Sequence, residues 1–258
     1  MFNWNIDPVL FSIGPLEIRY YGVFFAAGLM LAYLLARKMC RIKNLSVDTL
    51  DDLSVYLIVG LIVGARFGHI IFYESDYYLA NPQQILKVWE GGLASHGAAI
   101  GTLVAYGIFL LRHKKVRVFD YADIVAVAAC IPISFIRLGN FFNSEIYGRI
   151  TDLPWAVTFS RIDDLSRHPS QIYEFLMGML ILAIMYPLWI RKNKKASSGF
   201  FFGLFFILYF AARFTVEFFK EYPLHENFFN LTTGQILSLP FFLFGCIIFF
   251  KSTHENNR

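Results

Sequence analysis

Seven long apolar runs constrain this chain more than any other feature of its sequence. They lie near residues 19–37, 53–73, 93–111, 119–139, 170–190, 199–219 and 235–250. A helix that crosses a bilayer needs roughly 20 apolar residues, whereas the strands of a membrane barrel are alternating segments of about 10 residues. Since a helix satisfies its own backbone hydrogen bonds in lipid, the runs predict an all-α polytopic membrane protein with about seven transmembrane helices.

The composition excludes an ordinary soluble fold. Hydrophobic residues make up 57% of the 258-residue chain and charged residues only 16%, against about 25% charged residues in soluble globular proteins. A soluble protein of this length would not bury 29 phenylalanines together with its other apolar side chains. We therefore expect residues 1–258 to form a single integral membrane domain.

The distribution of Lys and Arg predicts the orientation. Fourteen cations lie in the connections near 37–43, 112–117 and 191–195 and in the C-terminal tail, and five lie in the other connections: Lys87, Arg149, Arg161, Arg167 and Lys220. The positive-inside rule then places the N-terminus on the outer side and the C-terminus in the cytoplasm, with a loop region around 140–169 on the outer side. Because topology explains the net charge of +4, no nucleic-acid partner is expected.

Neither the N-terminal segment nor the cysteines indicate a processing signal, a metal site or a disulfide. The first eighteen residues contain no Lys or Arg, so we expect no cleavable signal peptide. Cys40, Cys130 and Cys246 are far apart in the sequence, and their spacing matches neither a metal site nor a disulfide framework. We interpret them as packing residues and expect no metal and no cofactor.

Three arginines stand inside or at the end of apolar runs, namely Arg66, Arg137 and Arg213. An intramembrane charge costs at least ~2.5–3.5 kcal/mol on insertion scales, so such residues are functional candidates. Arg213 has Glu217 at i+4, and a structural ion pair is the alternative there. Arg66 lies in "GLIVGARFGHIIFY", whose glycines favour close helix packing, so Arg66 and His69 are expected in the interior, where either can be structural.

The polar end of the fourth run is the most unusual stretch. In "PISFIRLGNFFNSEIYGR", Arg137, Asn140 and Asn143 recur every three residues and share a helix face if the helix reaches them. Gly139 allows a bend, and Glu145 begins the following loop. This face predicts a polar site at the outer end of the helix.

Other helix starts on the same side also carry polar groups. His96 opens the third run in "ASHGAAIG", although a histidine at a helix start is often only a cap or a satisfied polar residue. Gln171 and Glu174 share a face in "RHPSQIYE", and Tyr20 and Tyr21 open the first run, where they are equally typical of an aromatic belt. These groups predict one cavity, open to the outer face, for a lipid head group.

Within that cavity, two arginines are candidates for the anion site. Guanidinium groups bind phosphate through paired hydrogen bonds. Arg137 and Arg213 are therefore predicted to clamp a phospholipid phosphate.

Several motifs together resemble one family, the bacterial prolipoprotein diacylglyceryl transferases. They are "FSIGPLEIRYYG", "HGAAIG", "RLGNFFNSEIYGR", "RHPSQIYE", "RFTVEFF" and "TGQILSLP", and the resemblance covers nearly the whole chain. It implies a seven-helix, multi-pass enzyme of the bacterial inner membrane. Such an enzyme transfers the diacylglyceryl group of phosphatidylglycerol to the lipobox cysteine thiol in a prolipoprotein signal peptide. The products are a thioether and glycerol 1-phosphate, in the first step of lipoprotein maturation.

The resemblance also implies roles for individual residues. The catalytic set is His96, Arg137, Arg213 and Tyr21, and the phosphatidylglycerol-binding set is Arg137, Asn140, Glu145, Gly148, Arg213 and Glu217. His96 is the expected general base for the thiol, with Tyr21 or a carboxylate as alternatives. The family's "HGG" is "HGA" here, with Ala98 in place of the second glycine.

Two other classes of function compete with a transferase. A transporter also places charges within the membrane, but often has internal repeats, and none is convincing between the two halves of this sequence. A structural scaffold needs no intramembrane arginines beside His and Glu. An enzyme is the best interpretation.

Overall fold

The computed structural model describes residues 2–14, 16–88, 91–192, 197–221 and 231–255. Within these ranges, six helical segments are long and apolar enough to cross a membrane. They are α1 (Tyr20–Lys43), α2 (Val47–Tyr73), α5 (Val118–Phe142), α6 (Ser170–Lys192), α7 (Phe200–Val216) with the 3-10 turn η3 (Glu217–Phe219), and α8 (Thr233–Glu255). Each matches a predicted run, so the chain is an α-helical, multi-pass membrane protein.

The seventh predicted run, 93–111, is also helical. It forms α4 (Ser95–Arg112), which is not among the six candidate spans. The count of seven spans and the orientation of the termini therefore stay predictions.

The chain divides into two compact units. Unit 1 comprises Met1–Met39 and Ala122–Arg258, and unit 2 comprises Cys40–Tyr121. Unit 1 thus contains most of α1 and α5 together with α6, α7 and α8, whereas unit 2 contains α2, α4, the short helix α3 (Ser75–Ala80) and the 3-10 turn η1 (Pro82–Leu86). A single integral membrane domain stays a prediction.

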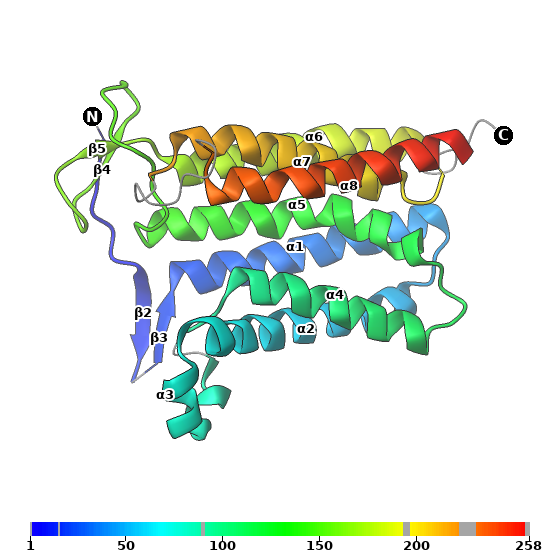
Figure 1. The fold of residues 1–258 in the computed structure, drawn as a ribbon, viewed down its shortest axis with the longest axis horizontal. Coiled ribbons are helices and arrows are strands. Elements are labelled where there is room, and N and C mark those ends of the chain that lie inside the picture. Colours follow the sequence, from blue (N-terminus) through cyan, green and yellow to red (C-terminus); the bar gives the residue numbers. More distant parts are fainter. Residues whose placement is uncertain (1, 15, 89–90, 193–196, 222–230, 256–258) are drawn as a thin grey trace. The chain divides into compact units, whose positions relative to one another are not determined.

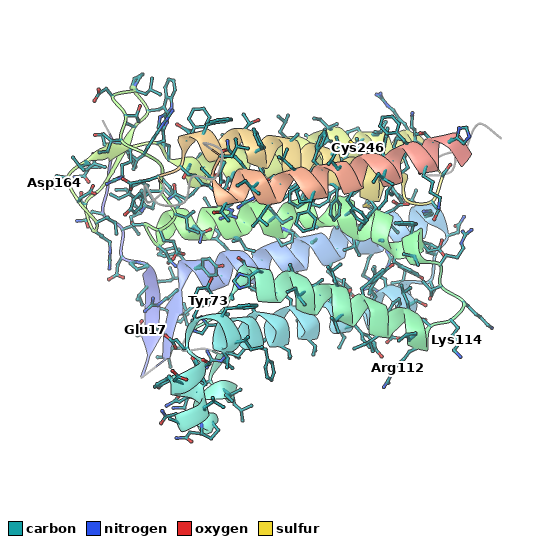
Figure 2. All side chains as sticks on the ribbon, in the orientation of Figure 1. Glu17, Tyr73, Arg112, Lys114, Asp164 and Cys246 are labelled. Atoms are coloured by element: carbon teal, nitrogen blue, oxygen red, sulfur yellow. The ribbon has the colours of Figure 1, made fainter. Side chains whose placement is uncertain are left out.

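In unit 2, glycines bring α2 and α4 into close contact (Figure 1). A Cβ atom added to Gly60 would lie 2.6 Å from the carbonyl oxygen of Gly101, and one added to Gly68 would lie 2.6 Å from the Cα atom of Gly97. The prediction that these glycines allow another helix to approach is confirmed. Figure 2 shows Arg112 and Lys114 at the end of this helix pair opposite Tyr73.

In unit 1, α5 lies between α1 and α6. A Cβ atom added to Gly28 of α1 would lie 2.9 Å from the Cβ atom of Phe135, and one added to Gly139 of α5 would lie 2.8 Å from the Cδ2 atom of Tyr21. Gly178 of α6 faces Ser134 of α5 even more closely. Gly139 thus serves close packing inside a helix that continues to Phe142, and not the bend that the sequence allowed.

Unit 1 also contains strands, which the pattern of apolar runs did not predict. A three-stranded sheet has the order β1 (Phe2–Trp4), β4 (Val157–Phe159) and β5 (Ser166–Arg167), with β1 parallel and β5 antiparallel to β4. The antiparallel pair β2 (Val9–Ile13) and β3 (Leu16–Arg19) precedes α1. Trp4, Phe141, Val157 and Phe159 form a hydrophobic cluster that joins the sheet to the end of α5.

Candidate functional site

A left-handed residue ends α5 and shapes the site. Ser144 has a φ of 55°, its N–H donates to the carbonyl of Phe141 at 3.0 Å, and the N–H of Glu145 donates to the carbonyl of Asn140 at 3.0 Å. This is the Schellman pattern, in which glycine is the usual left-handed residue. The turn brings Glu145 back over the last turn of the helix.

A network of amides connects this turn to the helix. The Nδ2 atoms of Asn140 and Asn143 both donate to Glu145 Oε1, at 2.8 and 3.1 Å. Arg137 Nη1 donates to Asn140 Oδ1 at 3.4 Å, and Gln171 Nε2 donates to the Glu145 carbonyl at 2.7 Å. The structure therefore brings together the residues that the fourth apolar run predicted as one polar site.

The two predicted clamp arginines meet at one carboxylate. Arg137 Nε of α5 lies 3.1 Å from Glu174 Oε2, and Arg213 Nη1 of α7 lies 3.3 Å from Glu174 Oε1. The Glu174 side chain on α6 is only 2% exposed, whereas those of Arg137 and Arg213 are 18% and 24% exposed. A buried carboxylate thus holds two guanidinium groups that remain partly accessible, which is suitable geometry for a second anion.

A third cation completes the cluster. Lys220 Nζ, directly after η3, lies 2.9 Å from Glu174 Oε1 and 3.2 Å from Glu217 Oε2. Lys220 lies in a connection, as predicted, but its side chain is only 6% exposed, so it is not a solvated loop charge. The i,i+4 pair of Arg213 with Glu217 is replaced by a pair of Arg213 with Glu174 and a pair of Glu217 with Lys220.

Gly148 and Tyr21 lie at the margins of this cluster. The Gly148 N–H donates to the His168 carbonyl at 2.9 Å, and a Cβ atom at Gly148 would lie 2.6 Å from the His168 Cβ atom and 2.5 Å from the Phe219 carbonyl oxygen. A side chain has no room there, which is a packing reason for glycine. Tyr21 packs against Gly139, close to the polar end of α5.

His96 belongs to unit 2. It is the second residue of α4, is exposed, and its ring lies 5.0 Å from that of Phe72 and 5.8 Å from that of Tyr73. Its catalytic role stays a prediction.

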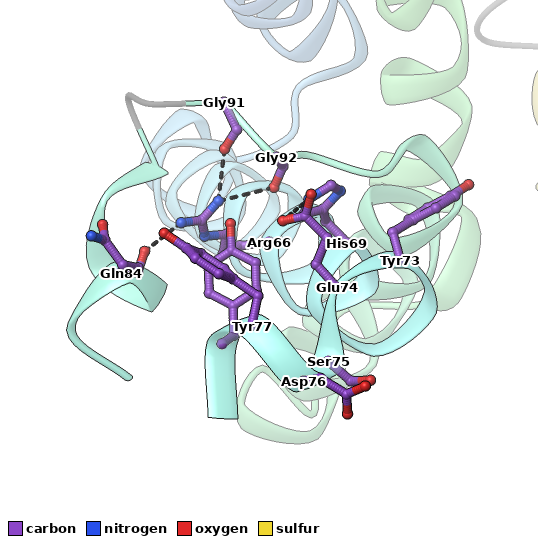
Figure 3. Close-up of a pocket in the computed structure, with 11 residues that line it drawn as sticks. Arg66, His69, Tyr73, Glu74, Ser75, Asp76, Tyr77, Gln84, Gly91 and Gly92 are labelled. Carbon is purple, nitrogen blue, oxygen red and sulfur yellow. Dashed lines mark hydrogen bonds and ion pairs between the residues drawn. The ribbon is translucent and has the colours of Figure 1, made fainter. Parts of the chain in front are cut away.

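Arg66 in unit 2 has a structural role. It is 4% exposed and its guanidinium lies 4.7 Å from the Tyr78 ring. Its donors reach five backbone carbonyls, those of Gln84, Ile85, Lys87, Gly91 and Gly92. These contacts border a cavity of about 630 Å³ in which His69 Nε2 lies 3.4 Å from Glu74 Oε2 (Figure 3). Arg66 therefore fixes the segment that follows α3.

Arg167 has a comparable role in unit 1. Its guanidinium lies 2.6 Å from both Asp163 Oδ2 and Glu221 Oε2, and over the Tyr147 ring at 4.7 Å. The hydrogen bond to Asp163 raises the pKa of Arg167 and lowers that of Asp163. This predicted loop cation is buried, and it joins the small sheet to Glu221.

Comparison with known proteins decides the family. A family model described as prolipoprotein diacylglyceryl transferase matches residues 8–251. The chain belongs to this family. A relative from Tolumonas auensis is 44% identical over the full length of both chains. Relatives from Chloroherpeton thalassium and Bacteroides fragilis are 38% and 39% identical, covering 98% and 96% of this chain and 94% of each relative. All three are named phosphatidylglycerol–prolipoprotein diacylglyceryl transferase.

In this member of the prolipoprotein diacylglyceryl transferase family, the predicted catalytic and phosphatidylglycerol-binding sets lacked Glu174 and Lys220, although Glu174 was among the polar groups predicted to form the cavity. Glu174 had a sequence signal, since a carboxylate at i+3 from Gln171 opens an otherwise apolar run. Lys220 had a weaker one, at i+3 from Glu217. The sequence does not show that Glu174 turns inward to the arginines of two other helices, or that Lys220 turns inward to Glu174 and Glu217.

Proposed function

We propose that this transferase moves the diacylglyceryl group of phosphatidylglycerol to the lipobox cysteine thiol of prolipoproteins. The reaction forms a thioether and releases glycerol 1-phosphate, as the first step of lipoprotein maturation in the bacterial inner membrane. Family membership and the names of the relatives support the choice of both substrates. The observation that carries the proposal is the convergence of Arg137 and Arg213 on one buried carboxylate.

The chemistry explains why two accessible guanidinium groups are useful. The substrate sulfur attacks the glycerol carbon of the diacylglyceryl group, and the bond from that carbon to the phosphate oxygen breaks. The leaving glycerol phosphate takes the electron pair, so negative charge grows on the phosphate. Arg137 and Arg213, held in place by Glu174, would stabilise that charge more strongly in the transition state than in the bound lipid.

The thiol must lose its proton because the thiolate is the nucleophile. We propose His96 as the general base, since an imidazole nitrogen can accept the proton of a thiol, with Tyr21 or a carboxylate as the alternative. Asn140 and Glu145 would orient the glycerol head group.

The remaining proposed roles concern support and placement. Gly148 and Glu217 would maintain the phosphatidylglycerol site. We further propose that α4 is the seventh span and that the N-terminus and the polar end of α5 face the periplasm, where a lipobox presented from that side would be within reach.

The test is transfer of radiolabelled diacylglycerol from phosphatidylglycerol to a lipobox peptide by purified protein. Arg137→Lys and Arg213→Lys keep the charge but lose the planar fork, and each should strongly slow transfer. Arg161→Lys is the matched control, because the Arg161 side chain is 40% exposed and lies 3.7 Å from Asp7. Transfer at the wild-type rate by either clamp variant would reject the clamp at that position.

A second arm of the test addresses the base. His96→Gln should block thioether formation while the protein still binds phosphatidylglycerol. Normal turnover by this variant would remove His96 as the base and leave the clamp untouched. Absence of any transfer by the wild-type protein would reject the proposed reaction itself.

A further inference from the structure

The charged cluster in unit 1 contains more groups than a simple phosphate clamp needs. Three cations, Arg137, Arg213 and Lys220, surround two buried carboxylates, Glu174 and Glu217. The formal charge of these five groups is +1, from three positive and two negative charges. Without Lys220, the two arginines would have to balance both carboxylates. The cluster would then have no net positive charge to attract a phosphate.

Glu217 is fixed from two sides. Lys220 Nζ lies 3.2 Å from its Oε2 atom. On the other side, the carboxylate lies against the first turn of α8, where a Cβ atom at Gly234 would overlap Glu217 Oε1. The glycine therefore lets the carboxylate approach a helix N-terminus, where the helix dipole stabilises negative charge.

The first turn of α8 is itself well defined. The N–H of Thr232 donates to Gln235 Oε1 at 3.0 Å, and the N–H of Gln235 donates to Thr232 Oγ1 at 3.2 Å. This reciprocal arrangement is a capping box. It gives "TGQILSLP" a physical role, because the box fixes the helix end and Gly234 leaves space for Glu217.

We propose that Lys220 is a positioning residue that keeps the net charge of the cluster around the arginine pair positive. It binds Glu217 and one oxygen of Glu174, so that Arg137 and Arg213 share a single carboxylate and retain net positive charge for the substrate phosphate. Lys220 itself is buried and acts through the arginines. The inference rests on the proposed function, because it assigns the phosphate of the leaving group as the anion.

Removal of this lysine gives a specific prediction. In Lys220→Met the formal charge of the cluster falls from +1 to zero, and the affinity for a phosphate should fall. One charge within about 10 Å in a partly buried site changes anion affinity by roughly 10- to 30-fold. We expect the KM for phosphatidylglycerol and the inhibition constant of glycerol 1-phosphate to rise by about this factor, and kcat to change less.

Charge compensation separates this role from simple packing. Glu217→Gln raises the formal charge to +2 and should make glycerol 1-phosphate a tighter inhibitor than it is for the wild type. The double variant Lys220→Met/Glu217→Gln has a formal charge of +1 and should return the inhibition constant to near the wild-type value. Lys220→Arg should keep most of the affinity.

The experiment measures transfer, inhibition by glycerol 1-phosphate and thermal unfolding of each purified variant in the same detergent. Lys251→Met, at an exposed lysine of α8, is the matched control. Recovery of thermal stability in the double variant without recovery of inhibition would overturn the proposal and leave a structural role. A Lys220→Met protein with wild-type KM and inhibition constant would also overturn it, while a wild type without transfer would reject the proposed function instead.

Discussion

The arginines within the apolar helices fall into two sets that have different partners in the protein. Arg66 of unit 2 is surrounded by backbone carbonyls and an aromatic ring, and only 4% of the residue is exposed. Arg137 and Arg213 of unit 1 share the carboxylate of Glu174, and about a fifth of each side chain is exposed. Both sets of partners offset the cost of a cation in lipid. They differ in how many guanidinium donors remain free to bind a ligand.

The difference indicates how to distinguish a structural arginine from a functional one. Five carbonyl acceptors commit the donors of Arg66 to the protein's own backbone, so this side chain has a fixed structural purpose. Arg137 and Arg213 share the Glu174 carboxylate, and Arg137 has one further amide acceptor in Asn140, so both guanidinium groups can still bind a second anion from their exposed side. An arginine in an apolar helix is therefore a candidate functional residue. Its partners decide whether its role is structural or functional.

The largest expected effect concerns the structural arginine. Arg66→Leu would leave several buried carbonyls without a donor, and the free energy of unfolding should fall by about 3–5 kcal/mol. Thermal unfolding in detergent measures this loss. A variant with wild-type stability would remove the distinction between Arg66 and the clamp arginines.

The next effect concerns the clamp. Arg137→Gln should lower the transfer rate by about 10²–10³-fold, the typical result of removing one group that stabilises developing charge. The thermal stability should change much less than in the Arg66 variant, because Arg213 and Lys220 still pair with Glu174. Equal losses of stability in the two variants would contradict the comparison.

A smaller effect is expected within the amide network. Asn140 both accepts from Arg137 and donates to Glu145, whereas Asn143 only donates to Glu145. One hydrogen bond contributes about 1 kcal/mol, so Asn140→Ala should slow transfer roughly 10-fold and Asn143→Ala only a few-fold. Steady-state kinetics of the two variants side by side would reveal any reversal of this order.

The smallest effect depends on pH at the margin of the site. Burial, with a contribution from Arg149, lowers the pKa of His168 from its ordinary value of 6.5. The unfolded segment then binds a proton more tightly than the folded one, so stability is fully present above about pH 6.5 and falls as pH drops below it. Hydrogen exchange of residues 148–168 should be faster at pH 5.5 than at pH 7.5, after correction for intrinsic rates.

The variant His168→Asn is the control for that measurement. It should lose most of the difference between the two pH values. A difference that persists unchanged would assign the effect to another group.

The sequence predicted the helices well and the strands poorly. A long apolar run in lipid has essentially one solution, because its backbone must bond to itself. Short strands such as β1 and β4 carry no such constraint, and three residues of alternating pattern do not stand out in an apolar chain. Their pairing, between residues 2–4 and 157–159, also spans a long separation in the sequence.

The site was predicted in part for a similar reason. Arg137, Asn140 and Glu145 lie within nine residues, so local periodicity and one turn bring them together. Glu174 joins the cluster from α6 and Lys220 from the connection after η3, and the local sequence does not show that a lysine in a connection turns inward.

The sequence by itself determined the class of protein, the helical segments and the family, because lipid solvation and contiguous motifs are properties of local residues. Only the tertiary structure decided that Glu174 holds both arginines, that Lys220 is buried between two carboxylates, and that Arg66 binds backbone carbonyls. Those outcomes depend on which helix faces meet, and the free energy of a buried charge is set by the partners that the fold brings to it.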